Sequence, residues 1–139
     1  MPEKRKIVIL GAGFGGLRVA LKLGRGLKRH GLIDRYEILL VDRNDHHTYA
    51  PLLYEVATTS KEIADLCRLY EVSAYKIAPL IKGCPINFIQ REVESIDLIE
   101  GDVHMKGGEK LRYDYLVIAL GAATNFYGIP GLKKGALPL

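Results

Sequence analysis

The sequence contains no tryptophan and only two cysteines, Cys67 and Cys84, which form no CxxC pair. Two isolated cysteines are typical of reduced thiols in a cytoplasmic protein, so we expect neither a redox pair nor a metal site. No apolar run approaches the ~20 residues that a membrane-spanning helix needs. The charged N-terminus leads directly into a short apolar run, which is unlike a secretory signal peptide. We therefore expect a cytoplasmic location.

The chain also lacks a strong excess of one charge. Its 139 residues are 26% charged and 48% hydrophobic, with a formal net charge of +4. This composition is ordinary for a globular α/β domain. A nucleic-acid partner would require a clustered basic face, and we expect none. The one visible basic cluster (Arg18, Lys22, Arg25 and Arg29) has helical spacing and is interpreted as the solvent face of a helix. Attraction to anionic lipid or to cofactor phosphates is the alternative.

The chain is rich in glycine, and four glycines stand close together near its start, between residues 11 and 16. Residues 5–10 form an apolar run that predicts a buried parallel strand, followed by Gly-Ala-Gly-Phe-Gly-Gly at 11–16 and a helical pattern over 14–29. In such a GxGxxG turn, Gly11 permits the tight turn and Gly16 permits close helix–strand packing. Gly13 permits close approach of a pyrophosphate to the backbone. The alternative is a glycine turn that packs a βα unit without any ligand.

A second apolar run, 36–41, ends in Asp42, a residue type that can accept hydrogen bonds from ribose hydroxyls. Asp42 follows Gly16 by 26 residues, somewhat more than the usual spacing of ~20. Strand, helix and strand together predict a right-handed βαβ unit. The sequence therefore indicates a domain that binds the diphosphate of a dinucleotide at the N-terminus of its first helix.

The middle of the chain is predicted to be helical. Pro51 suits the first turn of a short helix. Thr59 and Glu62 form a capping-box pattern that predicts a helix starting near residue 60, and apolar residues continue at helical spacing as far as Ile81. His46 and His47 could suggest a metal pair or a proton relay. Because adjacent side chains point apart and no third ligand is evident, we interpret them as part of a polar loop near a cofactor.

The second half is predicted to be mostly extended. Residues 86–90 indicate a third parallel strand, and 92–98, 102–105 and 110–113 a small antiparallel meander. Residues 115–120 indicate a further buried parallel strand that Gly121 ends. The tail, 122–139, contains Gly128, Pro130, Gly131 and Pro138 and has the composition of a linker. The predicted fold is thus α/β, a Rossmann-like FAD/NAD(P)-binding domain with a parallel sheet, flanking helices and an antiparallel meander.

Several segments carry a family resemblance. Residues 113–122 resemble the second fingerprint of flavoproteins with two dinucleotide domains, although Ala-Leu-Gly stands where those proteins have Ala-Thr-Gly. Together with 11–17, 41–44, the Pro-Leu-Leu-Tyr-Glu-Val-Ala block at 51–57 and the Asn-Phe-Tyr-Gly-Ile-Pro-Gly block at 125–131, they resemble the N-terminal part of type II NADH dehydrogenases. These are single-subunit NADH:quinone oxidoreductases that use FAD.

The resemblance implies a set of cofactor-binding residues. Gly11, Gly13 and Gly16, with the amides of Phe14 and Gly15, would hold the FAD pyrophosphate. Asp42 would bind the adenosine ribose with Arg43 beside it, and the backbone around Val93 would meet the adenine. Pro51 and Leu52 would pack near the isoalloxazine. The far side of the cofactor would be lined by Ala119, Leu120 and Gly121. No catalytic residue is assigned.

By the same resemblance, residues 1–139 correspond to an incomplete N-terminal FAD-binding domain, without the family's NADH-binding and membrane-anchoring parts. The family reaction passes hydride from NADH to FAD and electrons on to quinone, at the cytoplasmic face of the membrane as a peripheral protein. We expect the 139-residue chain alone to be inactive and to self-associate through uncovered apolar surface. Three alternatives stay open: a stand-alone NAD(P)- or FAD-binding module without catalysis, a non-catalytic interaction protein, and part of a sulfide:quinone oxidoreductase.

Overall fold

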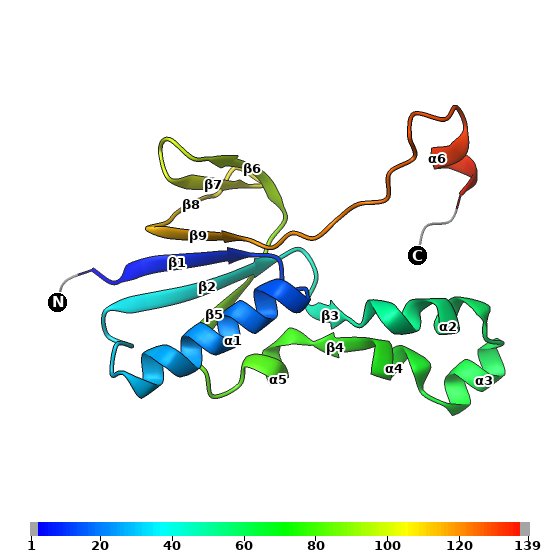
Figure 1. The fold of residues 1–139 in the computed structure, drawn as a ribbon, viewed down its shortest axis with the longest axis horizontal. Helices are drawn as coiled ribbons and strands as arrows, with labels where there is room; N and C mark the ends of the chain where they lie inside the picture. Colours follow the sequence, from blue (N-terminus) through cyan, green and yellow to red (C-terminus); the bar gives the residue numbers. More distant parts are fainter. Residues whose placement is uncertain (1–2, 137–139) are drawn as a thin grey trace. The chain divides into compact units, whose positions relative to one another are not determined.

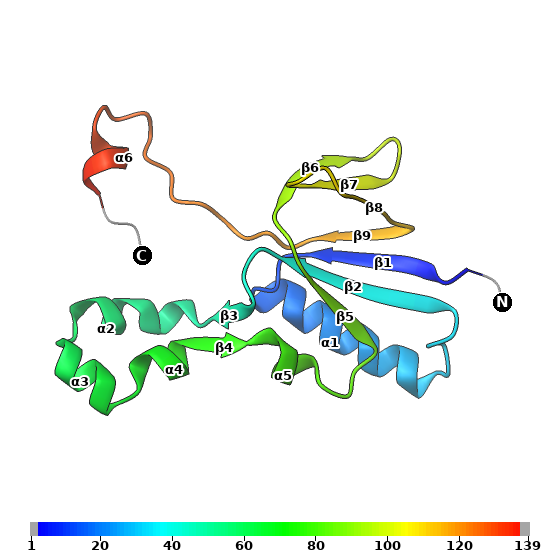
Figure 2. The same ribbon diagram turned by 180° about the vertical axis from the view of Figure 1, so that it is seen from behind.

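The computed structural model describes residues 3–136 and divides into two compact units. The first unit comprises the chain up to residue 47 together with 75–120, and the second comprises 48–74 together with the chain from 121 onward. Figures 1 and 2 show these parts from opposite sides. Among residues 3–136 no helix combines the length and hydropathy that crossing a bilayer requires.

The first unit is built on a four-stranded parallel sheet. Its strands, in spatial order, are β5 (Ile86–Gln90), β2 (Tyr36–Asp42), β1 (Arg5–Leu10) and β9 (Tyr115–Ile118). The crossover from β1 to β2 is α1 (Phe14–Arg29), which runs along the sheet in Figure 1. This arrangement confirms the predicted βαβ unit and the third parallel strand.

Both faces of β1 and β2 are covered, which explains their unbroken apolar sequences. On one face, Ile9 and Leu40 pack with Leu17, Ala20 and other residues of α1. On the other face, the alternate strand residues pack against Val103 and its neighbours in the meander. The meander consists of β6 (Val93–Asp97), β7 (Asp102–Met105) and β8 (Lys110–Arg112), paired antiparallel as predicted.

The predicted long helix from residue 60 to 81 is wrong as a single element. The structure has α3 (Lys61–Leu66), α4 (Leu69–Ser73), β4 (Ala74–Lys76) and α5 (Ile77–Ile81) in its place. The break after α3 coincides with Arg68, whose φ of 52° lies in the left-handed region that no helix interior adopts. Residues with helical spacing therefore lie on several short elements, of which α5 buries Ile77 and Ile81 whereas the residues of β4 are exposed.

Two smaller predictions also need correction. The N-cap of α3 is Ser60, whose hydroxyl accepts a hydrogen bond from the Ile63 N–H, rather than Thr59. β9 ends at Ile118 and is not fully buried: Tyr115 is 46% and Ile118 is 59% exposed. The reason is position, since β9 is an edge strand of the described sheet.

The second unit is mainly short helices. It contains η1 (Ala50–Leu52), α2 (Leu53–Thr58), α3, α4 and α6 (Leu132–Gly135). Pro51 stands in the first turn of η1, as predicted. The chain between 121 and 131 is irregular, in agreement with its linker composition, while Pro138 lies outside the described residues. A short strand, β3 (His46–Thr48), pairs with β4.

Candidate dinucleotide site

The glycine turn lies at the carboxyl end of β1. Because β1 and β2 are neighbouring parallel strands, the carboxyl end of β2 lies beside it. The Gly11 N–H donates to the Val41 carbonyl at 2.7 Å, and Gly11 has a φ of +95°. A Cβ at Gly11 would overlap the carbonyl oxygen of Ala119, which follows β9. The first glycine is therefore required twice, by its left-handed backbone and by the close approach of the chain after β9.

Gly16 and Gly13 differ in what requires them. A Cβ at Gly16 would overlap the Gly11 carbonyl oxygen and would lie 3.3 Å from the Ala119 Cβ, so this glycine allows α1 to pack against the turn. A Cβ at Gly13 would meet no protein atom within 4 Å, and its φ of −68° suits any residue. The fold therefore does not require glycine at 13. Its absent side chain leaves open backbone, which is what a pyrophosphate needs for close approach.

The N-terminus of α1 has the properties of an anion site. Gly13 is its N-cap and offers no side-chain hydrogen bond, and the first turn contains no acidic residue, whereas Lys28 and Arg29 lie in the last turn. The amides at the start of a helix have no carbonyl partner within it, and the helix dipole is positive at that end. The uncapped end therefore favours an anionic group beside Gly13.

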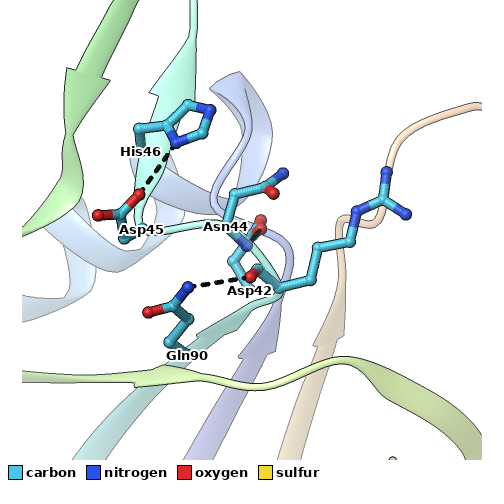
Figure 3. Close-up of polar contacts among 6 residues, drawn as sticks. Asp42, Asn44, Asp45, His46 and Gln90 are labelled. Carbon is cyan, nitrogen blue, oxygen red and sulfur yellow. Dashed lines mark hydrogen bonds and ion pairs between the residues drawn. The ribbon is translucent and has the colours of Figure 1, made fainter.

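Asp42, at the end of β2, supports the turn directly. Its carboxylate accepts from the Ala12 N–H at 2.7 Å and from the Asn44 N–H at 2.8 Å, the second of which is drawn in Figure 3. A carboxylate has about four acceptor positions, so capacity is left for ribose hydroxyls. Gln90, at the end of β5, donates to the Arg43 carbonyl at 3.3 Å. The loop after β2 is thus fixed from two neighbouring strands.

His47 lies beside the glycine turn, in a short strand and not in the polar loop near a cofactor that the sequence suggested. It lies in β3, is only 7% exposed, and its Nδ1 lies 3.0 Å from the Ala12 carbonyl oxygen. The ring of Phe14 meets it edge-on, with centroids 4.7 Å apart. No local signal in the sequence reveals this contact, because 35 residues separate the partners.

The neighbouring His46 has a different environment. Its Nδ1 pairs with the Asp45 carboxylate at 3.0 Å, as Figure 3 shows, and this hydrogen bond holds the pKa of Asp45 below its ordinary value. The two histidines therefore have separate partners. Within residues 3–136, no group of three or more His, Cys, Asp or Glu side chains is arranged to hold a metal ion.

The other predicted cofactor residues are distributed over both units. Ala119 and Leu120 adjoin the turn, with the Ala119 N–H donating to the Leu10 carbonyl at 2.8 Å. Val93 begins β6 and packs against the meander-side face of the sheet. Pro51, Leu52 and Gly121 belong to the second unit, and their contacts with a cofactor stay a prediction.

The parallel sheet, the crossover helix, the glycine turn and the acid at the end of β2 together define a dinucleotide-binding α/β domain. The sequence pattern of the family described as pyridine nucleotide-disulphide oxidoreductases matches residues 5–138 of this chain. The chain therefore belongs to the pyridine nucleotide-disulphide oxidoreductase family, whose members are FAD-dependent and use NADH. This membership confirms the predicted fold and oxidoreductase class.

Two curated relatives show which members of this family the chain resembles. The chain is 40% identical to the demethylphylloquinone reductase NdbB of Synechocystis over 95% of its length, and 30% identical to a type II NADH:quinone oxidoreductase of Staphylococcus aureus over 99%. The chain spans 31% of the length of each of these proteins. The resemblance to type II NADH dehydrogenases is thus confirmed for a region corresponding to less than a third of such a protein.

Solved structures agree on the architecture. The chain matches NDH2 of Plasmodium falciparum in complex with NADH at 28% identity with a TM-score of 0.73, covering 95% of this chain and 25% of that one. It matches the sulfide:quinone oxidoreductase of Aquifex aeolicus at 27% identity with a TM-score of 0.74, covering 94% and 27%. The two neighbours have almost the same TM-score, so the fold alone does not separate them.

Proposed function

We propose that this chain is the FAD-binding part of an NADH:quinone oxidoreductase. The observation that carries the proposal is the open backbone at Gly13 beside the uncapped end of α1, with Asp42 at the adjoining strand end. The choice of reaction is supported by the likeness, over almost the whole chain, to one relative named as a demethylphylloquinone reductase and to another named as a type II NADH:quinone oxidoreductase. In that reaction hydride passes from NADH to FAD, and electrons continue to quinone.

The residues present suit the ADP half of FAD. The amides of Phe14, Gly15 and Gly16 at the start of α1 would bind the pyrophosphate, and the spare acceptor positions of Asp42 would bind the ribose, with Arg43 beside it. We assign the adenine to the backbone around Val93. Pro51 and Leu52 would face the isoalloxazine, and Ala119 to Gly121 the far side of the cofactor. FAD supplies the redox chemistry when bound, and the chain supplies position and electrostatics.

Sulfide:quinone oxidoreductase is the second candidate, because one such enzyme is among the structural neighbours. The Staphylococcus aureus relative, which is named as an NADH:quinone oxidoreductase, favours NADH as the electron donor instead. Cys67 is exposed and Cys84 is half-buried, and both are free thiols. Neither cysteine falls in a motif that we can match to a sulfide site. We therefore prefer the NADH:quinone oxidoreductase as the function.

We further propose that the protein works at the cytoplasmic face of a membrane as a peripheral protein, and that the 139-residue chain self-associates. Relatives named as quinone oxidoreductases support the first proposal, because quinones are lipid-soluble substrates. The half-exposed apolar side chains of β9 support the second.

The cofactor proposal is tested by titrating the purified chain with FAD, FMN and NAD, with binding followed by calorimetry. FAD is expected to bind most tightly, because FMN lacks the ADP moiety for which the glycine turn is suited. Tighter binding of FMN than of FAD would contradict the assignment. Preference for NAD over FAD would favour the stand-alone nicotinamide-binding module.

A further inference from the structure

Among the residues that the structure describes, His47 is the buried histidine near the glycine turn, and the proposed cofactor contacts give it no role. Its ring is held between two parts of that turn, with Nδ1 at 3.0 Å from the Ala12 carbonyl oxygen and the ring edge-on to Phe14. A carbonyl oxygen can only accept a hydrogen bond, so Nδ1 must carry the proton. The Phe14 contact restricts rotation of the imidazole and keeps Nδ1 directed at Ala12.

This contact determines the orientation of one peptide group. The Ala12 carbonyl and the Gly13 N–H belong to the same planar trans peptide and point in opposite directions. Anchoring the Ala12 oxygen to His47 therefore turns the Gly13 N–H away from His47. Gly13 is exposed, and a Cβ on it would meet no protein atom within 4 Å, so a ligand can approach its backbone.

Asp42 fixes the peptide group between Gly11 and Ala12, which precedes the one that His47 contacts. It accepts the Ala12 N–H at 2.7 Å, while His47 donates to the Ala12 carbonyl. The two peptide groups that flank Ala12 are thus fixed by two different side chains, one from the end of β2 and one from β3. Ala12 itself is 2% exposed, which leaves it little room to move.

We propose that His47 is a positioning residue of the dinucleotide site, and that its Nδ1–H aims the Gly13 amide at the ligand's diphosphate. The inference rests on the proposed dinucleotide-binding function. A pre-oriented amide binds phosphate without reorganisation, whereas a free peptide would have to be ordered on binding. The effect should therefore appear with ligands that carry the diphosphate and be absent with adenosine alone.

The test compares ADP and adenosine binding to His47→Leu, His47→Asn and the wild-type chain by calorimetry. Asn places an amide nitrogen two bonds from Cβ, as Nδ1 is in histidine, so it can restore the donor. We expect His47→Leu to bind ADP about tenfold more weakly, the loss typical of one hydrogen bond, and adenosine unchanged. We expect His47→Asn to bind ADP within about threefold of wild type. His46→Leu is the matched control and should bind ADP normally, because the His46 ring pairs with the Asp45 carboxylate and not with the Ala12 carbonyl.

A second measurement does not depend on the folding of a variant. The imidazole ¹⁵N shifts of wild-type His47 at pH 8, where an ordinary imidazole is neutral, should show a protonated Nδ1 and an unprotonated Nε2. The opposite tautomer would overturn the proposal. So would an equal loss of ADP and adenosine affinity in His47→Leu, or unchanged ADP affinity. Failure of the wild-type chain to bind ADP at all would overturn the proposed function instead, and the role of His47 with it.

Discussion

At the scale of single residues, the three glycines of the turn divide into two kinds. Gly11 and Gly16 are required by the protein itself, since a Cβ at either would overlap backbone. Gly13 is not required by any protein contact. Two of the three glycines are therefore explained by the packing of the protein, whereas Gly13 is explained by the approach of a ligand. This difference allows folding and binding to be separated by mutation.

Gly13→Ala is expected to fold and to bind poorly. Its backbone dihedrals suit alanine, so the stability loss should stay below about 1 kcal/mol, the cost of replacing glycine by alanine at an N-cap. The added methyl would occupy the place of the phosphate, and ADP affinity should fall more than about tenfold. Urea denaturation and calorimetry measure the two quantities. Unchanged ADP affinity in a folded Gly13→Ala protein would contradict the site.

Gly16→Ala is expected to be unstable, because its Cβ would overlap the Gly11 carbonyl oxygen. We expect a loss of about 1–3 kcal/mol or more, as for other overpacked sites. Gly26→Ala, in the same helix but with no atom within 4 Å of the new Cβ, is the matched control. It should gain about 0.5–1 kcal/mol from helix propensity. Urea denaturation of both variants checks this contrast, which similar stabilities would contradict.

At the scale of elements, helix and strand bounds are predicted best where a hydrophobic pattern is followed by a turn motif such as the glycine turn. β1, α1 and β2 have the predicted bounds, because an unbroken apolar run, a glycine turn and an amphipathic pattern each favour one structure. The segment from residue 60 to 81 shows the opposite case. Apolar residues at helical spacing occur there without a continuous helix, since a left-handed residue at Arg68 and the strand β4 interrupt it.

Two other features depend on contacts distant in sequence. Nothing in residues 115–120 distinguishes a central strand from an edge strand, since that depends on what lies beside it. The role of His47 likewise depends on how β3 returns to the glycine turn, 35 residues away. The glycine and Asp42 contacts were predictable because the turn and the strand end are adjacent in every βαβ unit of this type.

The turn between β6 and β7 provides a prediction at this scale. The N–H groups of Glu100 and Ile99 donate to the Asp97 carboxylate, each at 2.9 Å, and hold the pKa of Asp97 below its ordinary value. A pKa that is lower in the folded state stabilises the turn above the ordinary aspartate range. That contribution is lost as pH falls through the lowered value.

The prediction for this turn is that hydrogen exchange at the Ile99 and Glu100 amides becomes less protected, after correction for intrinsic rates, as pH falls below the ordinary range of aspartate. NMR titration of the Asp97 carboxyl should give a midpoint below that range. In Asp97→Asn the acid-dependent loss of protection should disappear. A midpoint at or above the ordinary value would contradict the hydrogen bonding described.

At the scale of the whole molecule, the edge strand β9 is the feature with the clearest consequence. Its Tyr115 and Ile118 are about half exposed, and Leu120 beyond it is 54% exposed. An exposed apolar strand edge is a template for pairing with another chain. We therefore expect oligomers at micromolar concentration in sedimentation velocity.

Ile118→Lys should shift that distribution toward monomer without loss of fold, because the side chain is already 59% exposed. Ile99→Lys is the control, since Ile99 is 94% exposed in the turn after β6 and lies away from β9 in sequence and sheet. A wild-type chain that sediments as a monomer would disprove self-association. Equal effects of the two lysines would disprove the role of β9.

We propose above all that this chain binds FAD through contacts with the ADP half of the cofactor. The most direct measurement is displacement of protein-bound FAD, with the released FAD separated by ultrafiltration and quantified by chromatography, and with ADP and FMN as competitors at equal concentration. ADP is expected to displace FAD and FMN is not, because Gly13 and Asp42 are placed for the diphosphate and the ribose of the adenosine side. Displacement by FMN with no effect of ADP would contradict it.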